Sequence, residues 1–339
     1  MKTRLLFIQR RESEFVSIDR VFRQVARNIS KGEFDVEFQN VPYGSGFAAV
    51  IKNLIFFRPQ PADIYHITGD INYIALRLPA KKTLLTIHDL IFLKRRSGPR
   101  RLILKKLYLD WPLRRVSAIT AISDATKNEL IKETGIDAAM IEVIENPLTE
   151  SFIGDAEGQF NAVRPTILQI GTAENKNISR LISALQGIDC KLRIVGRLDE
   201  ECTRQLAASD IRYEIISGLD DLQMVEEYRK TDIVTFCSTY EGFGLPIIEA
   251  QATQRPVVTS DLAPMNTVAG AGAALVDPYR VESIAAAVKR VINDGEYRRS
   301  IVTAGIENVK RFDGNTIAAK YAAIYRRMTD MKVDRKNSR

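Results

Sequence analysis

Short apolar runs bounded by turn residues alternate along the chain with segments in which apolar positions recur at helical spacing. Such runs are typical of strands buried on both faces, and the segments between them are typical of crossover helices. In the first half the pattern predicts strands over 4–9, 64–68, 83–87, 118–122 and 141–144. In the second half it predicts strands that end at Gly171, Gly196, Ser238, Ser260 and Pro278. The alternation indicates an α/β fold with two doubly wound parallel sheets.

The stretch 151–165 is polar, contains glycine and proline, and lacks periodicity, as linkers do. We therefore expect an N-terminal Rossmann-like domain over 1–150 and a C-terminal one over 166–312. Helical spacing in 313–330 predicts a last helix, which we expect to cross back to the N-terminal domain. Ligands of open parallel sheets bind beyond the carboxyl ends of the strands, so the chemistry is expected there, between the two domains.

Composition narrows the class of protein. With 339 residues, of which 45% are hydrophobic and 27% charged, the chain is long enough for two packed cores, and collagen-like, disulfide-stapled and wholly disordered proteins are excluded. Cys190, Cys202 and Cys237 are odd in number and lack C-x-x-C spacing, which favours a reducing compartment. No run approaches the roughly 18 apolar residues of a membrane span, so we expect a cytoplasmic protein.

The formal net charge of +7 is concentrated between Lys94 and Arg115, where nine basic residues accompany a single acidic one. A patch of this kind implies an anionic partner. Apolar residues interleave with the charges, so a helix here could lie on an anionic bilayer, as a peripheral contact at the inner face of the plasma membrane. It could equally be a solvated helix whose apolar side joins the core. No helix-turn-helix, zinc or ribonucleoprotein signature accompanies the charge, so no nucleic-acid partner is expected.

The segment 238–250, STYEGFGLPIIEA, places a glycine-rich loop between a strand and a helix whose first turn contains proline. Gly242 and Gly244 let the backbone bend closely around a ligand, and the amide N–H groups at the helix start favour a phosphate. Glu241 then lies in the loop and Glu249 on the helix. On these residues alone, a ligand site and a solvated turn followed by a helix-dipole contact fit the two glutamates equally well.

EGFGLPIIEA resembles the E-x(7)-E motif of the family 4 retaining glycosyltransferases, and the resemblance extends over nearly the whole chain. It implies the GT-B fold, in which two Rossmann-like domains face a central cleft. By this resemblance Glu249 accepts hydrogen bonds from the ribose hydroxyls of a nucleotide-sugar donor. Glu241, a catalytic candidate, accepts them from the sugar hydroxyls. The resemblance also implies donor binding by the backbone N–H groups of Phe243, Gly244 and Leu245.

A second part of the resemblance is TILQIGTAENKNISRLISAL, residues 166–185, which is similar to the first strand, phosphate loop and helix of the family's donor domain. It implies that Gly171 opens the loop and that Lys176 contacts the donor diphosphate as a catalytic cation. Most relatives carry an arginine where this chain has Thr172, so a second cation must come from elsewhere or be missing. Arg197, after the next strand, is the candidate. Taken alone, Lys176 could also be a surface lysine beside a helix cap.

TIHDL, residues 86–90, resembles the family's N-terminal-domain signature at a strand end. The resemblance places His88 beside the reacting sugar and acceptor, as a positioning group in catalysis, and Asp89 in the turn that shapes the loop. His66 and Asp70, from HITGD after the preceding strand, are further acceptor-side candidates. A histidine at a strand end is also often a hydrogen-bonded structural residue, and for His66 that interpretation stays open.

The resemblance implies a hexosyltransferase that retains the anomeric configuration and takes a nucleoside diphosphate sugar, GDP-mannose or a UDP-sugar, as donor. The expected acceptor is a saccharide or lipid-linked saccharide in polysaccharide or lipopolysaccharide biosynthesis. Lysine and loop amides can stabilise the departing diphosphate, and no D-x-D pattern lies in a suitable loop, so neither a metal nor a cofactor is expected. Two alternatives stay open. A nucleotide-sugar epimerase would use the same scaffold, and a non-catalytic GT-B protein would explain Thr172 and Thr267, where relatives usually have arginine and glutamate.

Overall fold

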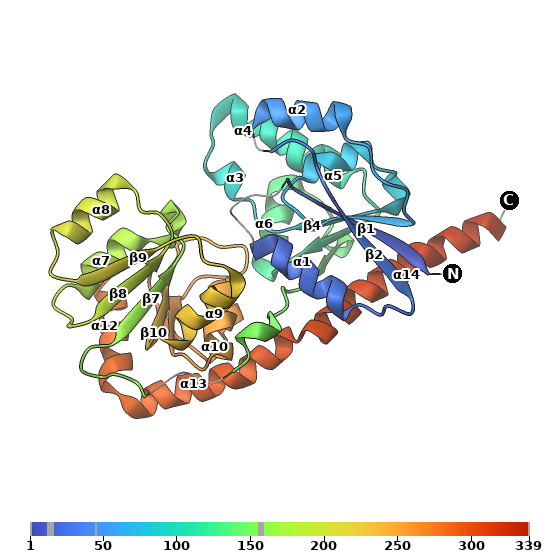
Figure 1. The fold of residues 1–339 in the computed structure, drawn as a ribbon. Coiled ribbons are helices and arrows are strands. Elements are labelled where there is room, and N and C mark those ends of the chain that lie inside the picture. The colour runs from blue at the N-terminus through green and yellow to red at the C-terminus, as the bar shows by residue number, and fades with distance from the viewer. Residues whose placement is uncertain (1, 12–16, 45, 155–158, 338–339) are drawn as a thin grey trace. The chain divides into compact units, whose positions relative to one another are not determined.

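The computed structural model describes residues 2–11, 17–44, 46–154 and 159–337. It contains two compact units, one formed by Met1–Pro147 with Asp313–Arg339 and the other by Leu148–Phe312. Each unit is built around its own parallel sheet and its own hydrophobic core (Figure 1). The described residues of the stretch 151–165, expected as a linker, belong to the second unit, and the C-terminal helix belongs to the first.

The sheet of the first unit has six parallel strands in the order β2-β1-β3-β4-β5-β6. They are β1 (Thr3–Gln9), β2 (Phe34–Asn40), β3 (Ile64–Ile67), β4 (Thr83–Ile87), β5 (Ala118–Ala121) and β6 (Ile141–Val143). Successive side chains of a strand point to opposite faces. Tyr65 and Ile67 therefore belong to the apolar core on one face of the sheet, whereas His66 between them points to the other face.

Helices cover both faces of this sheet. On the His66 face, α1 (Ser17–Asn28) packs against α14 (Gly314–Asn337). The other helical segments of the unit are α2 (Phe47–Phe56), η1 (Asn72–Arg77), η2 (Ala80–Lys82), α3 (Ile91–Lys94), α4 (Gly98–Lys105), η3 (Lys106–Asp110), α5 (Trp111–Leu113), α6 (Asp124–Thr134) and η4 (Ala138–Met140). Ser123 caps α6, since its Oγ accepts a hydrogen bond of 3.1 Å from Thr126 N, as serine before a helix predicts.

The sheet of the second unit also has six parallel strands, in the order β12-β11-β10-β7-β8-β9. They are β7 (Thr166–Ile170), β8 (Lys191–Val195), β9 (Arg212–Ile216), β10 (Ile233–Phe236), β11 (Val257–Ser260) and β12 (Ala274–Val276). The helical segments are η5 (Glu150–Phe152), η6 (Glu174–Lys176), α7 (Ile178–Leu185), α8 (Glu200–Ala207), α9 (Asp221–Arg229), α10 (Leu245–Ala252), α11 (Met265–Ala269), α12 (Val281–Asn293), α13 (Gly295–Val309) and η7 (Lys310–Phe312). The prediction of two doubly wound parallel sheets is confirmed.

The pattern of apolar runs does not predict two of the strands, β2 and β9, and both lie at an edge of their sheet. The strand β2 reads FDVEFQN and β9 reads RYEII, with charged residues at positions that alternate with apolar ones. Most of their side chains are exposed or half-buried, whereas every residue of β3, β4 and β10 is buried. An edge strand tolerates and even favours charge, because charge discourages pairing with other chains. A search for buried apolar runs therefore finds central strands and overlooks edges.

Candidate active site

The strand order of the second unit creates a switch point between β7 and β10. After β7 the chain continues to β8 and β9 on one side, and β10, β11 and β12 then extend the sheet on the other side. The loops that leave β7 and β10 therefore diverge, and in such sheets ligands bind beyond these strand ends. The loop after β7 runs through Gly171 to Lys176, and the loop after β10 runs to Gly244 at the start of α10. Both glycine-containing motifs of the sequence thus meet at one position.

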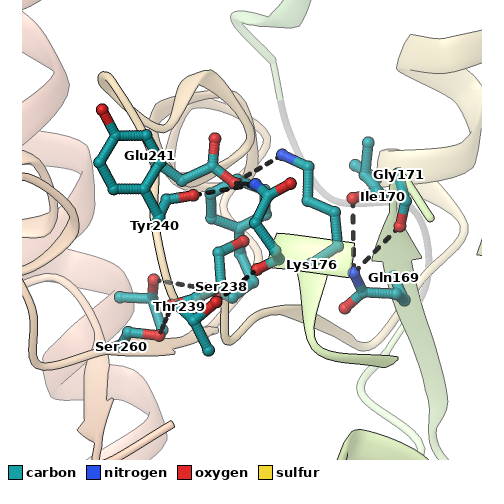
Figure 2. Close-up of polar contacts among 12 residues, drawn as sticks. Gln169, Ile170, Gly171, Lys176, Ser238, Thr239, Tyr240, Glu241 and Ser260 are labelled. Atoms are coloured by element: carbon teal, nitrogen blue, oxygen red, sulfur yellow. Dashed lines mark hydrogen bonds and ion pairs between the residues drawn. The ribbon is translucent and has the colours of Figure 1, made fainter. Parts of the chain in front are cut away.

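Lys176 and Glu241 form an ion pair at this switch point (Figure 2). Lys176 Nζ lies 2.6 Å from Glu241 Oε1. Asn175 Nδ2 donates to the same carboxylate oxygen and to Tyr240 O, and Thr239 N donates to Asn175 O at 2.8 Å. The two loops are therefore tied together, and they hold a cation and a carboxylate side by side beyond the ends of β7 and β10.

Gln169, near the end of β7, holds the start of the following loop through side-chain hydrogen bonds. Its side chain is fully buried, and its Nε2 donates to the carbonyl oxygens of Ile170 and Gly171, both at 3.4 Å (Figure 2). Thr235 of β10 donates its hydroxyl to Gln169 Oε1 at 3.3 Å. We had not identified Gln169 from the sequence. The signal was present, because it is a polar residue inside an otherwise apolar strand core, TILQI.

Glycine is required at two points of this loop region. Gly171 has a φ of +79°, in the left-handed region, and a Cβ there would lie 3.0 Å from Lys176 Cε. Gly196 also has a positive φ, and a Cβ there would lie 2.7 Å from Thr172 Cγ2. Thr172 therefore lies against Gly196, the residue before Arg197. The fold therefore brings the backbone that leads into Arg197 beside Thr172.

Glu249 is buried on α10, and its Oε2 accepts a hydrogen bond of 2.6 Å from Tyr228 Oη. Tyr228 comes from α9, is fully buried, and its ring packs edge-on against Phe152 with 5.3 Å between centroids. A buried carboxylate needs such partners, because an uncompensated charge in the interior is costly. Tyr228 therefore orients Glu249. No motif marks Tyr228 in the sequence, since the contact joins helices of two different crossover units.

The start of α10 presents backbone N–H groups beside the ion pair. Gly244 has a φ of +114°, and a Cβ there would lie 2.9 Å from Ile247 Cδ1, so the turn requires glycine. Phe243 anchors the loop, because its buried ring packs edge-on against Phe312 with 5.6 Å between centroids. Among the described residues, none accepts a hydrogen bond from the amides of Phe243, Gly244 or Leu245. Such amides at a helix start are suited to binding a phosphate.

In the first unit, the ends of β1, β3 and β4 bring together Arg10, Asp70 and His88. His88 Nε2 donates to Thr68 O at 2.7 Å, which leaves the Nδ1 lone pair as an acceptor. Burial lowers the pKa of His88, so the ring is neutral at pH 7. Arg10 Nη1 lies 3.6 Å from Asp70 Oδ1. We had not identified Arg10 from the sequence, because it stands in a charged run, QRRESE, that is typical of any solvated loop.

His66, the other acceptor-side candidate, lies inside the core of the same unit. Its side chain is fully buried, Nδ1 lies 2.7 Å from Tyr325 Oη of α14, and Nε2 lies 2.7 Å from Thr86 Oγ1. The rings of Phe7 and Phe22 pack edge-on against it. This position leaves no surface of His66 for an acceptor. The geometry favours the alternative interpretation, a hydrogen-bonded structural residue, which here ties the C-terminal helix to the sheet.

This burial predicts a loss of stability in mild acid. Burial, with His88 nearby, holds the pKa of His66 well below its usual value of about 6.5. The unfolded chain therefore takes up a proton before the folded one does. The free energy of unfolding therefore has its full value, as far as His66 is concerned, above about pH 6.5. It decreases as the pH falls below that value, by up to ~1.4 kcal/mol per pH unit. Urea unfolding between about pH 7.5 and 5.5 measures this slope, because ordinary carboxylates titrate lower.

The matched variant is His66→Gln, which removes the titrating group while keeping hydrogen-bonding atoms in the cavity. We expect a smaller dependence of the unfolding free energy on pH, with the remainder arising from His88, the only other histidine of the chain. The absolute stability will also fall, so the slope and not the midpoint is the relevant quantity. An unchanged slope in His66→Gln would assign the pH effect to other groups.

The remaining chemical candidates have structural positions. Asp89 Oδ1 accepts a hydrogen bond of 2.9 Å from Ile91 N and so holds the turn that leads into α3. Burial raises the pKa of the Cys237 thiol to about 12 and that of Cys190 to about 11, so both thiols are protonated at pH 7. In the described part of the chain, no group of three or more His, Cys, Asp and Glu residues is arranged to hold a metal ion.

The basic segment 94–115 divides its apolar side chains between core and surface. Leu104, Leu107 and Tyr108 pack on the core of the first unit, whereas Leu102, Ile103 and Trp111 are exposed. The apolar side chains of this segment therefore join the core only in part, and membrane contact by the exposed ones stays a prediction. Over the residues described, no helix combines the length and the apolar character needed to span a bilayer.

The chain matches two family descriptions that together cover most of its length. Residues 20–151 match Glycosyltransferase Family 4, and residues 155–308 match Glycosyl transferases group 1. A solved structure, that of Anabaena HepE in complex with UDP and glucose, superposes with a TM-score of 0.73 over 95% of this chain and 99% of that one, at 17% identity. The fold of both units is therefore that of this solved structure.

Two curated relatives are similar over most of both chains. The MMP alpha-(1->4)-mannosyltransferase of Mycolicibacterium hassiacum is 24% identical over 313 residues, 87% of this chain and 71% of that protein. The O-antigen chain mannosyltransferase B of Escherichia coli is 26% identical over 276 residues, 74% of this chain and 70% of that protein. Together with the family matches and the two doubly wound sheets, these similarities identify the chain as a member of the family 4 glycosyltransferases, nucleotide-sugar-dependent enzymes of the GT-B fold.

Proposed function

We propose that this enzyme transfers mannose from a nucleoside diphosphate sugar to a hydroxyl group of a saccharide or lipid-linked saccharide, with retention of the anomeric configuration. The observation that carries the proposal is the Lys176–Glu241 pair at the switch point, with the buried Glu249 on the adjoining helix. Both curated relatives described above are mannosyltransferases. The HepE structure holds UDP, so GDP-mannose and a UDP-sugar are the two donors to compare.

The donor would bind beyond the ends of β7 and β10. The Lys176 ammonium and the amides of Gly244 and Leu245 offer hydrogen bonds to the diphosphate, and bonds between charged partners are the strong ones. Arg197 would supply a second cation in place of the arginine absent at Thr172. The carboxylate of Glu249, oriented by Tyr228, would accept hydrogen bonds from the ribose hydroxyls. This set of protein cations and amides is sufficient to stabilise a departing diphosphate.

In the proposed reaction, the bond between sugar C1 and the diphosphate oxygen breaks, and the acceptor oxygen bonds to C1 on the same face. The departing phosphate oxygen takes the proton of the acceptor hydroxyl, so no protein base is consumed. Lys176 stabilises the charge that develops on the diphosphate, and Glu241 orients the sugar through its hydroxyls. His88, with Nδ1 as an acceptor, would orient the acceptor hydroxyl, and Asp70 is a second acceptor-side group.

We further infer that the enzyme works as a peripheral protein on the inner, anionic face of the cytoplasmic membrane. The support is the excess of eight positive charges in 94–115, together with the exposed apolar side chains of that segment. Such a mixture of cations and apolar groups favours an anionic bilayer surface. A lipid-linked acceptor would be presented at the same surface.

A donor panel tests the nucleotide-sugar assignment. We expect GDP and GDP-mannose, or else UDP and its sugars, to raise the unfolding midpoint, because a ligand that binds only the folded state stabilises it by ~2.7 kcal/mol at about 100 times its dissociation constant. Thermal unfolding is measured with each diphosphate, with and without magnesium. Adenosine and inorganic diphosphate serve as controls for the separate halves of the ligand. If no nucleoside diphosphate shifts the midpoint of folded protein, the proposed donor site does not exist.

A further inference from the structure

The helix α2 presents an apolar face to solvent. Phe47, Ile51 and Ile55 follow one another at a spacing of four residues, which places them on one side of the helix. Their side chains are 65%, 42% and 52% exposed. A surface helix of a globular protein normally turns polar residues outward. An exposed apolar stripe of this kind marks a surface that another body covers.

The opposite side of α2 is firmly attached to the first unit. Asn53 is fully buried, and its Nδ2 donates to Tyr73 Oη at 2.8 Å and to Tyr43 O at 2.9 Å. Val50 is buried beside it in the core. The exposed apolar face of α2 is therefore separate from the face that packs on the core. The core-facing side chains already have their packing and hydrogen-bond partners within the first unit.

The basic segment 94–115 lies on the same side of the sheet as α2. The ring of Tyr108 packs against that of Tyr73 with 5.2 Å between centroids, so Tyr73 contacts both this segment and α2. Figure 1 shows α2 and α4 at the same end of the first unit. Leu102, Ile103 and Trp111 of the basic segment also expose their apolar side chains. We call the exposed side chains of α2 and 94–115 together the docking surface.

The cations of the docking surface differ in how they are engaged. Lys94, Arg101 and Lys105 form ion pairs with Glu129, Glu133 and Asp110. In the part of the chain that the structure describes, no ion pair is found for the exposed side chains of Arg96, Arg100, Lys106, Arg114 and Arg115. No acidic residue occurs between Val41 and Ala62, the sequence around α2. The surface thus carries strong positive charge next to exposed apolar groups.

We propose that the docking surface binds an anionic lipid bilayer, with the apolar face of α2 entering the interfacial region and the unpaired cations contacting the headgroups. This deepens the membrane association stated under Proposed function and rests on it. Lipid is the occupant that satisfies both chemistries, since headgroups are anionic and acyl chains are apolar. A second copy of the chain would bring two positive surfaces together, and like charges repel. A nucleic acid would leave the stripe of α2 uncovered.

Trp111, the single tryptophan of the chain, makes the test direct, because it is half exposed and lies within the docking surface. Vesicles of phosphatidylcholine with about one quarter phosphatidylglycerol are titrated into the whole protein. We expect a blue shift of the tryptophan emission and sedimentation with the vesicles. Pure phosphatidylcholine should bind at least tenfold more weakly. High salt should weaken binding to the anionic vesicles, since charge attraction is screened.

Two variants separate the contributions. Phe47→Gln with Ile51→Gln and Ile55→Gln removes the stripe, leaves the ring of Phe56 against Tyr43, and uses a good helix former. We expect the partition coefficient on anionic vesicles to fall at least tenfold, with its salt dependence retained. Arg96→Gln with Arg100→Gln and Lys106→Gln should lose the preference for anionic vesicles instead. Arg101 stays unchanged, because its pair with Glu133 is structural.

The matched control is Ile153→Gln with Leu222→Gln, which removes exposed apolar side chains of the second unit, and its partition should equal that of the wild type. Circular dichroism and the nucleotide-induced thermal shift verify that each variant is folded. If the partition coefficient of the α2 variant lies within twofold of the wild-type value, the inference on α2 is wrong, while the membrane association under Proposed function is unaffected. A wild type that ignores anionic vesicles overturns the membrane association as well, while the nucleotide shift still reports on the donor site. A dimer in solution that the α2 variant dissociates would assign the stripe to a second copy and also overturn it.

Discussion

Replacing Glu249 with glutamine or alanine is expected to weaken nucleoside diphosphate binding by about 10- to 100-fold, or ~1.5–3 kcal/mol, the range for hydrogen bonds to a charged group. The buried carboxylate on α10 is held by Tyr228 Oη, so it is already oriented before a ligand arrives. Glutamine keeps the shape and an acceptor oxygen for Tyr228 but removes the charge. Alanine removes both. Calorimetric titration with the diphosphate identified in the donor panel measures the effect.

The control for this prediction must lower stability without touching the ribose site. Thr253 is fully buried at the end of the same helix, and its Oγ1 donates to the backbone carbonyls of Glu249 and Ala250. Thr253→Val should therefore lower the unfolding free energy and leave the nucleotide affinity unchanged. The nucleotide affinity of Tyr228→Phe should lie between those of Thr253→Val and Glu249→Gln, because loss of the tyrosine hydroxyl frees the Glu249 carboxylate to rotate. Wild-type affinity in both Glu249 variants would remove this residue from the ribose role.

Replacing Lys176 with methionine is expected to lower kcat by about 10²- to 10³-fold, the usual effect of removing one group that stabilises developing negative charge. The variant also leaves Glu241 beside the diphosphate without its cation, so the donor affinity should fall as well. Lys176→Arg restores the charge and should recover part of the activity. Initial rates of nucleotide release at varied donor concentration give kcat and KM separately.

A double variant distinguishes a catalytic lysine from a structural ion pair. If the Lys176–Glu241 contact serves only to join the two loops, adding Glu241→Gln to Lys176→Met removes the stranded carboxylate and should restore the affinity for the nucleoside diphosphate, which lacks the sugar that Glu241 would contact. We expect this affinity to stay low in the double variant. Lys191→Met is the matched control, because Lys191 pairs with Glu214 at 2.8 Å on the surface of the same unit. A comparable loss of kcat in Lys191→Met would mean that the assay reports stability.

The central residues of the proposed donor site could be identified in the sequence because their signals are local. Glu241, Glu249 and Lys176 each stand in or next to a glycine-containing loop that follows an apolar strand, and parallel strands bring such loops to one edge. Tyr228 and Arg10 could not be predicted in the same way. Tyr228 lies on a helix with no motif and reaches Glu249 across helix packing, and Arg10 looks like any charge in a solvated loop.

The sequence by itself determined the α/β class, the two parallel sheets and the glycosyltransferase motifs. Runs of a few neighbouring residues are enough to indicate a buried strand or a glycine-rich loop. The tertiary structure alone decided which polar groups are buried and which apolar groups are exposed. His66 is removed from solvent by Tyr325, which stands 259 positions further along the chain. The stripe of α2 is exposed because, among the segments that the structure describes, none in its unit packs over it. The burial of a side chain depends on all the residues that pack against it, most of them distant in the sequence, so no pattern of neighbouring residues predicts it.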